Sequence, residues 1–116
     1  MLPPKNRLTK KKDFDIIFKK GKTLKGDSLI YKALKNGLKE DRFGFVVSKK
    51  ISNKATQRNK IKRRLRRAVS DELKKYNSVG DKESLDIVII TLPGIEKKSF
   101  LEIKEIIDKL LNDRPK

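Results

Sequence analysis

The 116-residue sequence contains no cysteine and no histidine. Without cysteine it has neither disulfides nor thiolate zinc sites, and without histidine it lacks the usual general base and the commonest metal ligand. It has no run of about 18 apolar residues, so a membrane-spanning helix is excluded. Residues 1–7 carry basic side chains with no apolar segment behind them, so we expect no secretory signal. These absences predict a cytoplasmic protein without a catalytic centre of its own.

Acidic side chains are also scarce. The sequence has 32 Lys and Arg against 15 Asp and Glu, which gives a formal charge of +17 at pH 7. Residues 1–26 hold nine basic and two acidic side chains, and residues 49–67 hold ten basic and no acidic ones. Charge gathered in two blocks, rather than spread evenly, is typical of a surface that binds a polyanion.

Hydrophobic residues make up only 35% of the chain, which is enough for one small core because they occur in periodic clusters. We therefore expect a single domain over residues 1–116, with frayed tails at residues 1–6 and 113–116. In the first half, apolar residues at helical spacing lie between Thr9, the expected N-cap, and Gly21, the expected stop. Strands are predicted at residues 28–34 and 42–48.

A hairpin connection is expected between these two strands, over residues 34–41, and a further short strand is predicted at residues 22–24. The second half is expected to contain a long helix over residues 54–76 and a buried central strand over residues 85–92. The last helix is expected to start with a capping box made by Ser99 and Glu102. The order α-β-β(-β)-α-β-α predicts an α+β fold, a two-layer α/β sandwich.

The long helix carries the strongest functional signal. At 3.6 residues per turn, Arg58, Lys62 and Arg66 share one face. Like charges at this spacing repel one another and destabilise an isolated helix, and an external polyanion would offset that repulsion. The alternative is a solvated helix of mixed charge, which would require interspersed acids, and these appear only from Asp71 onward. The pattern therefore favours binding to nucleic acid.

The same segment carries a family resemblance. Residues 54–63 are Lys-Ala-Thr-Gln-Arg-Asn-Lys-Ile-Lys-Arg, which resembles the Arg-Asn-Arg-rich signature of the protein component of bacterial ribonuclease P. Lys60 stands where the second signature arginine usually lies, so the charge is kept but bidentate phosphate geometry is lost. Residues 42–50, Arg-Phe-Gly-Phe-Val-Val-Ser-Lys-Lys, are similar to the strand that leads into this helix in the family. Further ordered matches lie at residues 6–8, 13–14, 18–21 and 86–90.

The resemblance implies the ribosomal protein S5 domain 2-like fold with a left-handed βαβ crossover. It also implies a protein subunit that binds ribonuclease P RNA and the 5′ leader of precursor tRNA, and that assists endonucleolytic removal of the leader. The RNA subunit is expected to hold the catalytic centre and the magnesium ions, so no catalytic residue, metal or cofactor is expected in the protein alone, and no membrane or DNA partner. The expected RNA-binding residues are Lys49, Lys50, Lys54, Arg58, Asn59, Lys60, Lys62, Arg63, Arg64, Arg66 and Arg67.

Three aromatic residues allow two interpretations. Phe14, Phe18 and Tyr31 are either core residues or a platform on which unpaired bases stack. In the resembled family, a cleft between the first helix and the sheet takes the 5′ leader. The resemblance places these residues and Arg7 in that cleft, Tyr31 only after a one-residue gap. Phe43, Phe45 and Phe100 are assigned to the core.

The carboxylates form no convincing catalytic site. Asp13 and Asp15 point to different faces of a helix, and Asp71, Glu72 and Asp86 are interpreted as solvated or dipole-balancing residues. Two rival classes of function remain. A small ribosomal or RNA-chaperone protein would bind structured RNA without leader-dependent affinity, and a stand-alone nuclease would require an acidic or histidine constellation.

Overall fold

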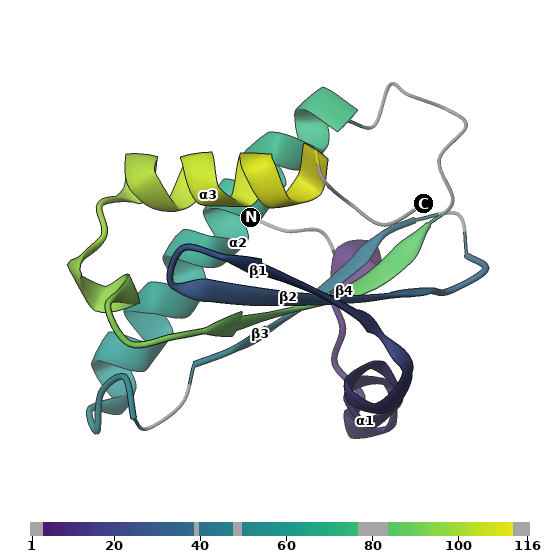
Figure 1. Ribbon diagram of the computed structural model, residues 1–116, viewed down its shortest axis with the longest axis horizontal. Coiled ribbons are helices and arrows are strands. Elements are labelled where there is room, and N and C mark those ends of the chain that lie inside the picture. The colour runs from purple at the N-terminus through teal and green to yellow at the C-terminus, as the bar shows by residue number, and fades with distance from the viewer. Residues whose placement is uncertain (1–3, 39, 48–49, 77–83, 113–116) are drawn as a thin grey trace.

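The structure, a computed structural model, describes residues 4–38, 40–47, 50–76 and 84–112. A four-stranded sheet of order β1-β2-β4-β3 has α1 on one face and α2 and α3 on the other (Figure 1). The predicted α+β class is therefore confirmed, and α1 adds a helix on the second face of the sheet. The elements are η1 (Pro4–Asn6), α1 (Lys11–Lys20), β1 (Lys22–Gly26), β2 (Leu29–Lys35), β3 (Arg42–Val46), α2 (Ala55–Tyr76), β4 (Leu85–Thr91), η2 (Ile95–Lys97) and α3 (Phe100–Asn112).

The strand β4 lies in the middle of the sheet. It pairs antiparallel with β2 and parallel with β3, and nearly all of its residues are buried. The predicted buried central strand is thus confirmed. The predicted hairpin between the strands now called β2 and β3 is wrong, because β4 lies between them. A strand buried on both faces gains most from the central position, and turn residues between β2 and β3 carry no information about it.

The hairpin of this sheet joins β1 and β2 instead. Gly26 pairs with Leu29, which leaves Asp27 and Ser28 as a two-residue turn, and Ser28 has a φ of 63°. The Nζ of Lys98 donates to Oδ2 of Asp27 at 2.9 Å, and this hydrogen bond lowers the pKa of Asp27. The short strand predicted at residues 22–24 is therefore confirmed and extends to residue 26.

Strand alternation divides the apolar residues between two cores, because neighbouring residues of a strand point to opposite faces. The larger core lies between the sheet and the pair α2 and α3, and it takes Leu29, Tyr31 and Ala33 from β2. The smaller core lies under α1 and is centred on Ile17 and Val88. None of the helices in the described ranges combines the length and the apolar character that a bilayer crossing requires.

The helix ends follow the sequence in part. The predicted capping box of α3 is present: Oγ of Ser99 accepts from N of Glu102 at 3.2 Å, and Oε1 of Glu102 accepts from N of Ser99 at 3.2 Å. The hydrogen bonds from Ser99 lower the pKa of Glu102. The N-cap predicted for α1 at Thr9 is wrong, because the helix begins one residue later, with Lys10 as its N-cap.

Gly21 ends α1 as predicted, but in an extended conformation with a φ of −70° rather than a left-handed one. Glycine is required at this position because the backbone of Ile17 lies too close for a side chain: a Cβ here would lie 2.5 Å from the carbonyl oxygen of Ile17. The backbone N–H of Gly21 donates to that same oxygen at 2.8 Å, which closes the last turn of the helix.

Two carboxylates that were expected to be solvated are buried. Asp86, 7% exposed, accepts from Nε of Arg42 at 2.7 Å and from its second terminal nitrogen at 2.6 Å. These hydrogen bonds raise the pKa of Arg42, whose other terminal nitrogen lies 3.7 Å from Oδ2 of Asp13 on α1. Glu72 is 1% exposed on the inner side of α2. The solvated interpretation was therefore wrong for both, and Asp86 instead joins β3, β4 and α1 through Arg42.

Candidate nucleic-acid interface

The helix α2 presents its cations because its apolar residues are used in the core. Ile61, Leu65, Ala68 and Val69 are buried in one stripe. The row Arg58, Lys62 and Arg66 lies half-buried along the flank of this stripe, as the helical spacing predicted. Lys60 and Arg63 are exposed on the outer side of the helix, Arg67 is exposed toward α3, and Arg64 is half-buried.

The opposite flank of α2 faces α3. The guanidinium carbon of Arg67 lies 5.1 Å from the ring centroid of Phe100, a cation–π contact. One turn further along α2, Oδ2 of Asp71 lies 3.7 Å from Nζ of Lys104 on α3. The protein therefore partly engages Arg67 itself, whereas the Arg58–Lys62–Arg66 row runs along the other flank of the helix.

The loop before α2 is organised by Arg58. One of its terminal nitrogens donates to the carbonyl oxygen of Ser52 at 2.9 Å, and Oγ of Ser52 accepts from N of Lys54 at 3.2 Å. Arg58 therefore supports the loop as well as contributing to the positive surface. Lys50, Lys54 and Asn59 are exposed here, and Lys49 lies outside the described residues.

Two of the predicted stacking residues lie together on α1. Phe14 is half-buried and Phe18 is 39% exposed, one turn apart. The helix packs on β2 and β4 through Ile17, which is 1% exposed. Nζ of Lys32 on β2 donates to the carbonyl oxygen of Phe18 at 3.4 Å. An aromatic pair with a cation beside it therefore lies on the side of the sheet that α1 covers, which we call the α1 face.

The prediction that Tyr31 stacks on a leader is contradicted by its burial. Tyr31 is 0% exposed and points into the core under α2 and α3. Its neighbour Lys32 points to the α1 face and was missed. A shift of one residue along a strand exchanges the two faces. The alternation of the buried residues Leu29, Tyr31 and Ala33 is the sequence signal that could have identified Lys32.

Phe14 is positioned by β3. A Cβ at Gly44 would overlap the Phe14 ring, so the ring lies directly against the glycine backbone. Asp13, the residue before Phe14 on α1, forms an ion pair with Arg42 of β3. The Arg-x-Gly sequence at residues 42–44 thus gives α1 both an ionic and a steric contact with β3.

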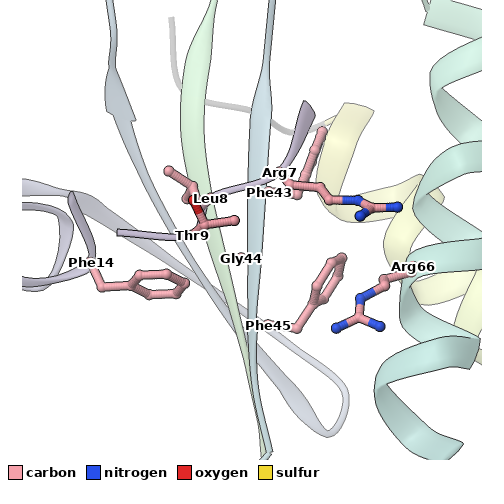
Figure 2. Close-up of a pocket in the computed structure, with 8 residues that line it drawn as sticks. All are labelled: Arg7, Leu8, Thr9, Phe14, Phe43, Gly44, Phe45 and Arg66. Atoms are coloured by element: carbon pink, nitrogen blue, oxygen red, sulfur yellow. The ribbon is translucent and has the colours of Figure 1, made fainter. Parts of the chain in front are cut away.

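A pocket of about 280 Å³ opens at the free edge of β3 (Figure 2). The segment before α1 covers only the start of this edge: Arg7 pairs with Phe43, and N of Leu8 donates to the carbonyl oxygen of Phe43 at 2.8 Å. Figure 2 shows Phe14 on one side of β3 and Phe45 on the other. The pocket, which we call the edge pocket, is lined by Arg7, Leu8, Thr9, Phe14, Phe43, Gly44, Phe45 and Arg66.

The edge pocket corrects the expected place of Arg7. Because Arg7 pairs with Phe43, its side chain points to the α2 side of β3, where Arg66 also lies (Figure 2). Phe14 reaches the pocket from the α1 face. Arg7 therefore meets Phe14 only at this pocket and points away from the α1 face, where it was predicted to lie with the Phe14–Phe18 pair.

Of the remaining aromatic residues, Phe43 is 1% exposed and its assignment to the core is confirmed. Phe45 and Phe100 are half-buried against that core. Each also lies near an arginine. Phe45 lines the edge pocket together with Arg66, and Phe100 lies under Arg67.

The acidic residues give little scope for chemistry at these surfaces. In the part of the chain that the structure describes, no three acidic side chains gather where they could hold a metal ion. Asp13 and Asp86 both face Arg42. The arrangement can bind phosphates and stack bases, and its described carboxylates are placed for ion pairing rather than for acid–base catalysis.

Comparison with known proteins provides independent evidence about this chain. A family model described as Ribonuclease P matches residues 2–114. The chain is 40% identical over 100 residues to the ribonuclease P protein component of Syntrophomonas wolfei, covering 86% of this chain and 79% of that protein. It is 36% identical over 103 residues to that of Legionella pneumophila, covering 89% and 83%.

Solved structures agree with this match. The ribonuclease P protein from Thermotoga maritima has a TM-score of 0.76 at 32% identity, over 95% of this chain and 98% of that one. The one from Staphylococcus aureus has a TM-score of 0.75 at 28% identity, over 93% and 94%. The similarity therefore extends over both the α2 surface and the α1 face.

Proposed function

The chain belongs to the ribonuclease P protein family, and from that membership we propose how its two surfaces divide the work. The holoenzyme is an endoribonuclease that matures the 5′ end of tRNA, with catalysis by its RNA subunit and this chain as its protein component. In our proposal, the cations of α2 bind the RNA subunit and the α1 face holds the single-stranded 5′ leader of precursor tRNA.

The charge and shape of α2 support the first assignment. Residues 49–67 carry ten basic and no acidic side chains, so a long RNA backbone can contact several of them at once. Arginine forks suit phosphate oxygens, and four of the ten are arginines between Arg63 and Arg67. Bringing two RNAs together is opposed by phosphate repulsion, and this helix reduces that repulsion.

The observation that carries the second assignment is the partly exposed Phe14–Phe18 pair beside Lys32. Stacking on an aromatic side chain contributes about 1–3 kcal/mol per base and tolerates any sequence, which suits leaders that differ between tRNAs. A leader is present in the precursor and absent from the product. A surface that binds it therefore discriminates between the two.

We assign magnesium to the RNA subunit. The described carboxylates do not gather into a set of oxygen ligands of the kind Mg²⁺ requires, so no step of the reaction is assigned to a metal held by this chain. We also propose that the protein works in the bacterial cytoplasm, where precursor tRNA is made.

The leader assignment is tested with Phe18→Ala. Because Phe18 is already 39% exposed, truncation removes a stacking surface with little loss of packing. We expect holoenzyme affinity for precursor tRNA to fall about tenfold, as loss of one stacked base predicts. Affinity for mature tRNA should not change. The measurement is equilibrium binding of both tRNAs to the reconstituted holoenzyme.

Ile16→Ala is the matched control, since Ile16 is an apolar residue of α1 that is 38% exposed and lies on the other side of Ile17. It should leave both affinities unchanged. Equal losses for precursor and mature tRNA in Phe18→Ala, or the same loss in Ile16→Ala, would show that the α1 face does not hold the leader.

A further inference from the structure

We propose that the edge pocket is a nucleotide-binding subsite for the RNA subunit, in which Arg7 and Arg66 hold a backbone phosphate and Phe45 contacts the adjoining sugar or base. This rests on the proposed binding of the RNA subunit by α2. It adds the N-terminal segment and the edge of β3 to that surface.

The first support is the open edge of the sheet. The carbonyl oxygen of Phe43 points outward, because it accepts from N of Leu8. Every second residue of a strand directs its backbone groups to the same edge, so the N–H and C=O of Phe45 also point outward, into the region the pocket occupies. Outward backbone N–H groups are donors that suit phosphate oxygens.

The second support is the charge of the lining. Arg7 and Arg66 come from the two basic blocks of the sequence, and both are half-buried in the pocket wall. The eight lining residues include no carboxylate. A phosphate in the pocket would accept forked, charge-assisted hydrogen bonds from both guanidinium groups.

The third support is size and surface. A water molecule takes about 30 Å³ in the liquid, so a pocket of about 280 Å³ has room for far more than one phosphate group. The half-buried ring of Phe45 supplies an apolar wall beside the two arginines (Figure 2). Phosphate donors next to an aromatic wall are the elements that a nucleotide requires.

The direction of α2 points to the RNA subunit as the ligand. Arg58, Lys62 and Arg66 span eight residues, or about 12 Å along the helix axis. An RNA strand that follows this row of side chains reaches the edge pocket at Arg66. The Phe14 ring forms the wall on the other side, between the pocket and the α1 face.

The test uses Arg7→Gln, Arg66→Gln, their double variant and Phe45→Leu in the full-length protein. Each arginine variant should lower affinity for the isolated RNA subunit about tenfold, as loss of a charged hydrogen bond predicts. Phe45→Leu should lower it by about the same factor, because the aromatic contact with the nucleotide is lost. The double variant should lose less than the product of the two, because both arginines hold one phosphate. Lys12→Gln removes an exposed cation from α1 and should change affinity less than twofold.

The ratio of precursor to mature tRNA affinity should stay constant in all of these variants. A changed ratio in Arg7→Gln would assign Arg7 to the leader and overturn the subsite, as would a loss no larger than that of Lys12→Gln. Failure of the leader proposal is detected separately, through Phe18→Ala.

A second measurement does not depend on the variants folding. Inorganic phosphate titrated into the unaltered protein should shift the backbone amide resonance of Phe45. Shifts confined to α2, with the Phe45 amide unmoved, would overturn the proposal.

Discussion

Gly44 shows how one absent side chain positions an aromatic residue of the proposed leader-binding surface. The Phe14 ring occupies the space that a Cβ would need, and Arg42, two residues earlier, holds the carboxylate of Asp13. The first turn of α1 is thus fixed against β3. The orientation of the Phe14–Phe18 pair on α1 therefore depends on contacts with β3.

Gly44→Ala should displace the Phe14 ring from its position against β3. Overpacking of this kind costs about 1–3 kcal/mol of the free energy of unfolding, and affinity for precursor tRNA should fall with it. In a Phe14→Ala background the effect of Gly44→Ala on precursor affinity should vanish, because no ring remains to be displaced. Binding and urea unfolding of the four proteins in this cycle test the coupling.

Gly37→Ala provides the control for loss of a glycine. Gly37 has a φ of 67° and no neighbour within 4 Å of the added Cβ, so the substitution strains a turn without touching α1. It should lower stability and leave leader binding unchanged. An effect of Gly44→Ala that persists without the Phe14 ring would mean that the glycine acts through the fold alone.

At this scale the candidate site was partly predictable. Phe14 and Phe18 follow from helical spacing, which is local. Tyr31 was placed in the leader cleft and Lys32 was missed, because the phase of a strand depends on which core its neighbours enter. The side of β3 on which Arg7 lies could not be predicted for the same reason: it is decided by the pairing of Arg7 with Phe43, 36 positions away in the chain.

The element that carries most of the proposed RNA-binding surface is α2, and its two flanks differ. One flank meets α3 through Arg67 and Asp71, and the other carries the Arg58–Lys62–Arg66 row toward β3. Arg58 also supports the preceding loop through Ser52. A test of RNA binding is therefore cleaner at Lys62 and Arg63 than at Arg58.

Lys62→Ala combined with Arg63→Ala should flatten the salt dependence of binding to the RNA subunit. Each lost phosphate contact reduces the slope of log K against log salt by about one, so the double variant should reduce it by about two. Titrations of affinity between 50 and 300 mM salt, concentrations of the kind in which such slopes are measured, provide the measurement.

The matched control removes two exposed lysines from elsewhere, Lys97→Ala with Lys109→Ala. Its slope should equal that of the unaltered protein, because the net charge falls equally without loss of a contact. If both double variants behave alike, binding follows overall charge and not the surface of α2.

The elements themselves were predicted better than their arrangement. Both long helices, the β4 strand and the Ser99–Glu102 box follow from periodicity and capping, which are properties of short segments. The hairpin expected over residues 34–41 failed, because β4 arrives from some 50 residues later in the chain and lies between β2 and β3. Strand order is decided by burial of the most apolar strand, and this burial exists only in the assembled sheet.

The whole molecule carries its charge unevenly. A formal +17 on 116 residues creates repulsion that opposes the compact state, and most of it is concentrated in residues 1–26 and 49–67. The edge pocket brings arginines of both blocks to one place. The fold is therefore expected to depend on bound anions.

Sulfate should stabilise the free protein more than chloride at equal ionic strength. An anion that binds only the native state adds about 2.7 kcal/mol to the free energy of unfolding at a hundred times its Kd. Screening alone would make the two salts equal at matched ionic strength. Urea unfolding in both salts is the measurement, and coincident curves would mean that no specific anion site contributes to stability.

The sequence by itself determined the two basic blocks, the helical and strand periods, the capping box and the family of the protein, because each is contained in local spacing or composition. The tertiary structure decided that β4 separates β2 from β3, that Lys32 rather than Tyr31 lies on the α1 face, and that Arg7 joins Arg66 in the edge pocket. These depend on strand order and register, which are set by contacts between distant segments. The charge predicted a polyanionic partner, and the fold placed that charge on particular surfaces.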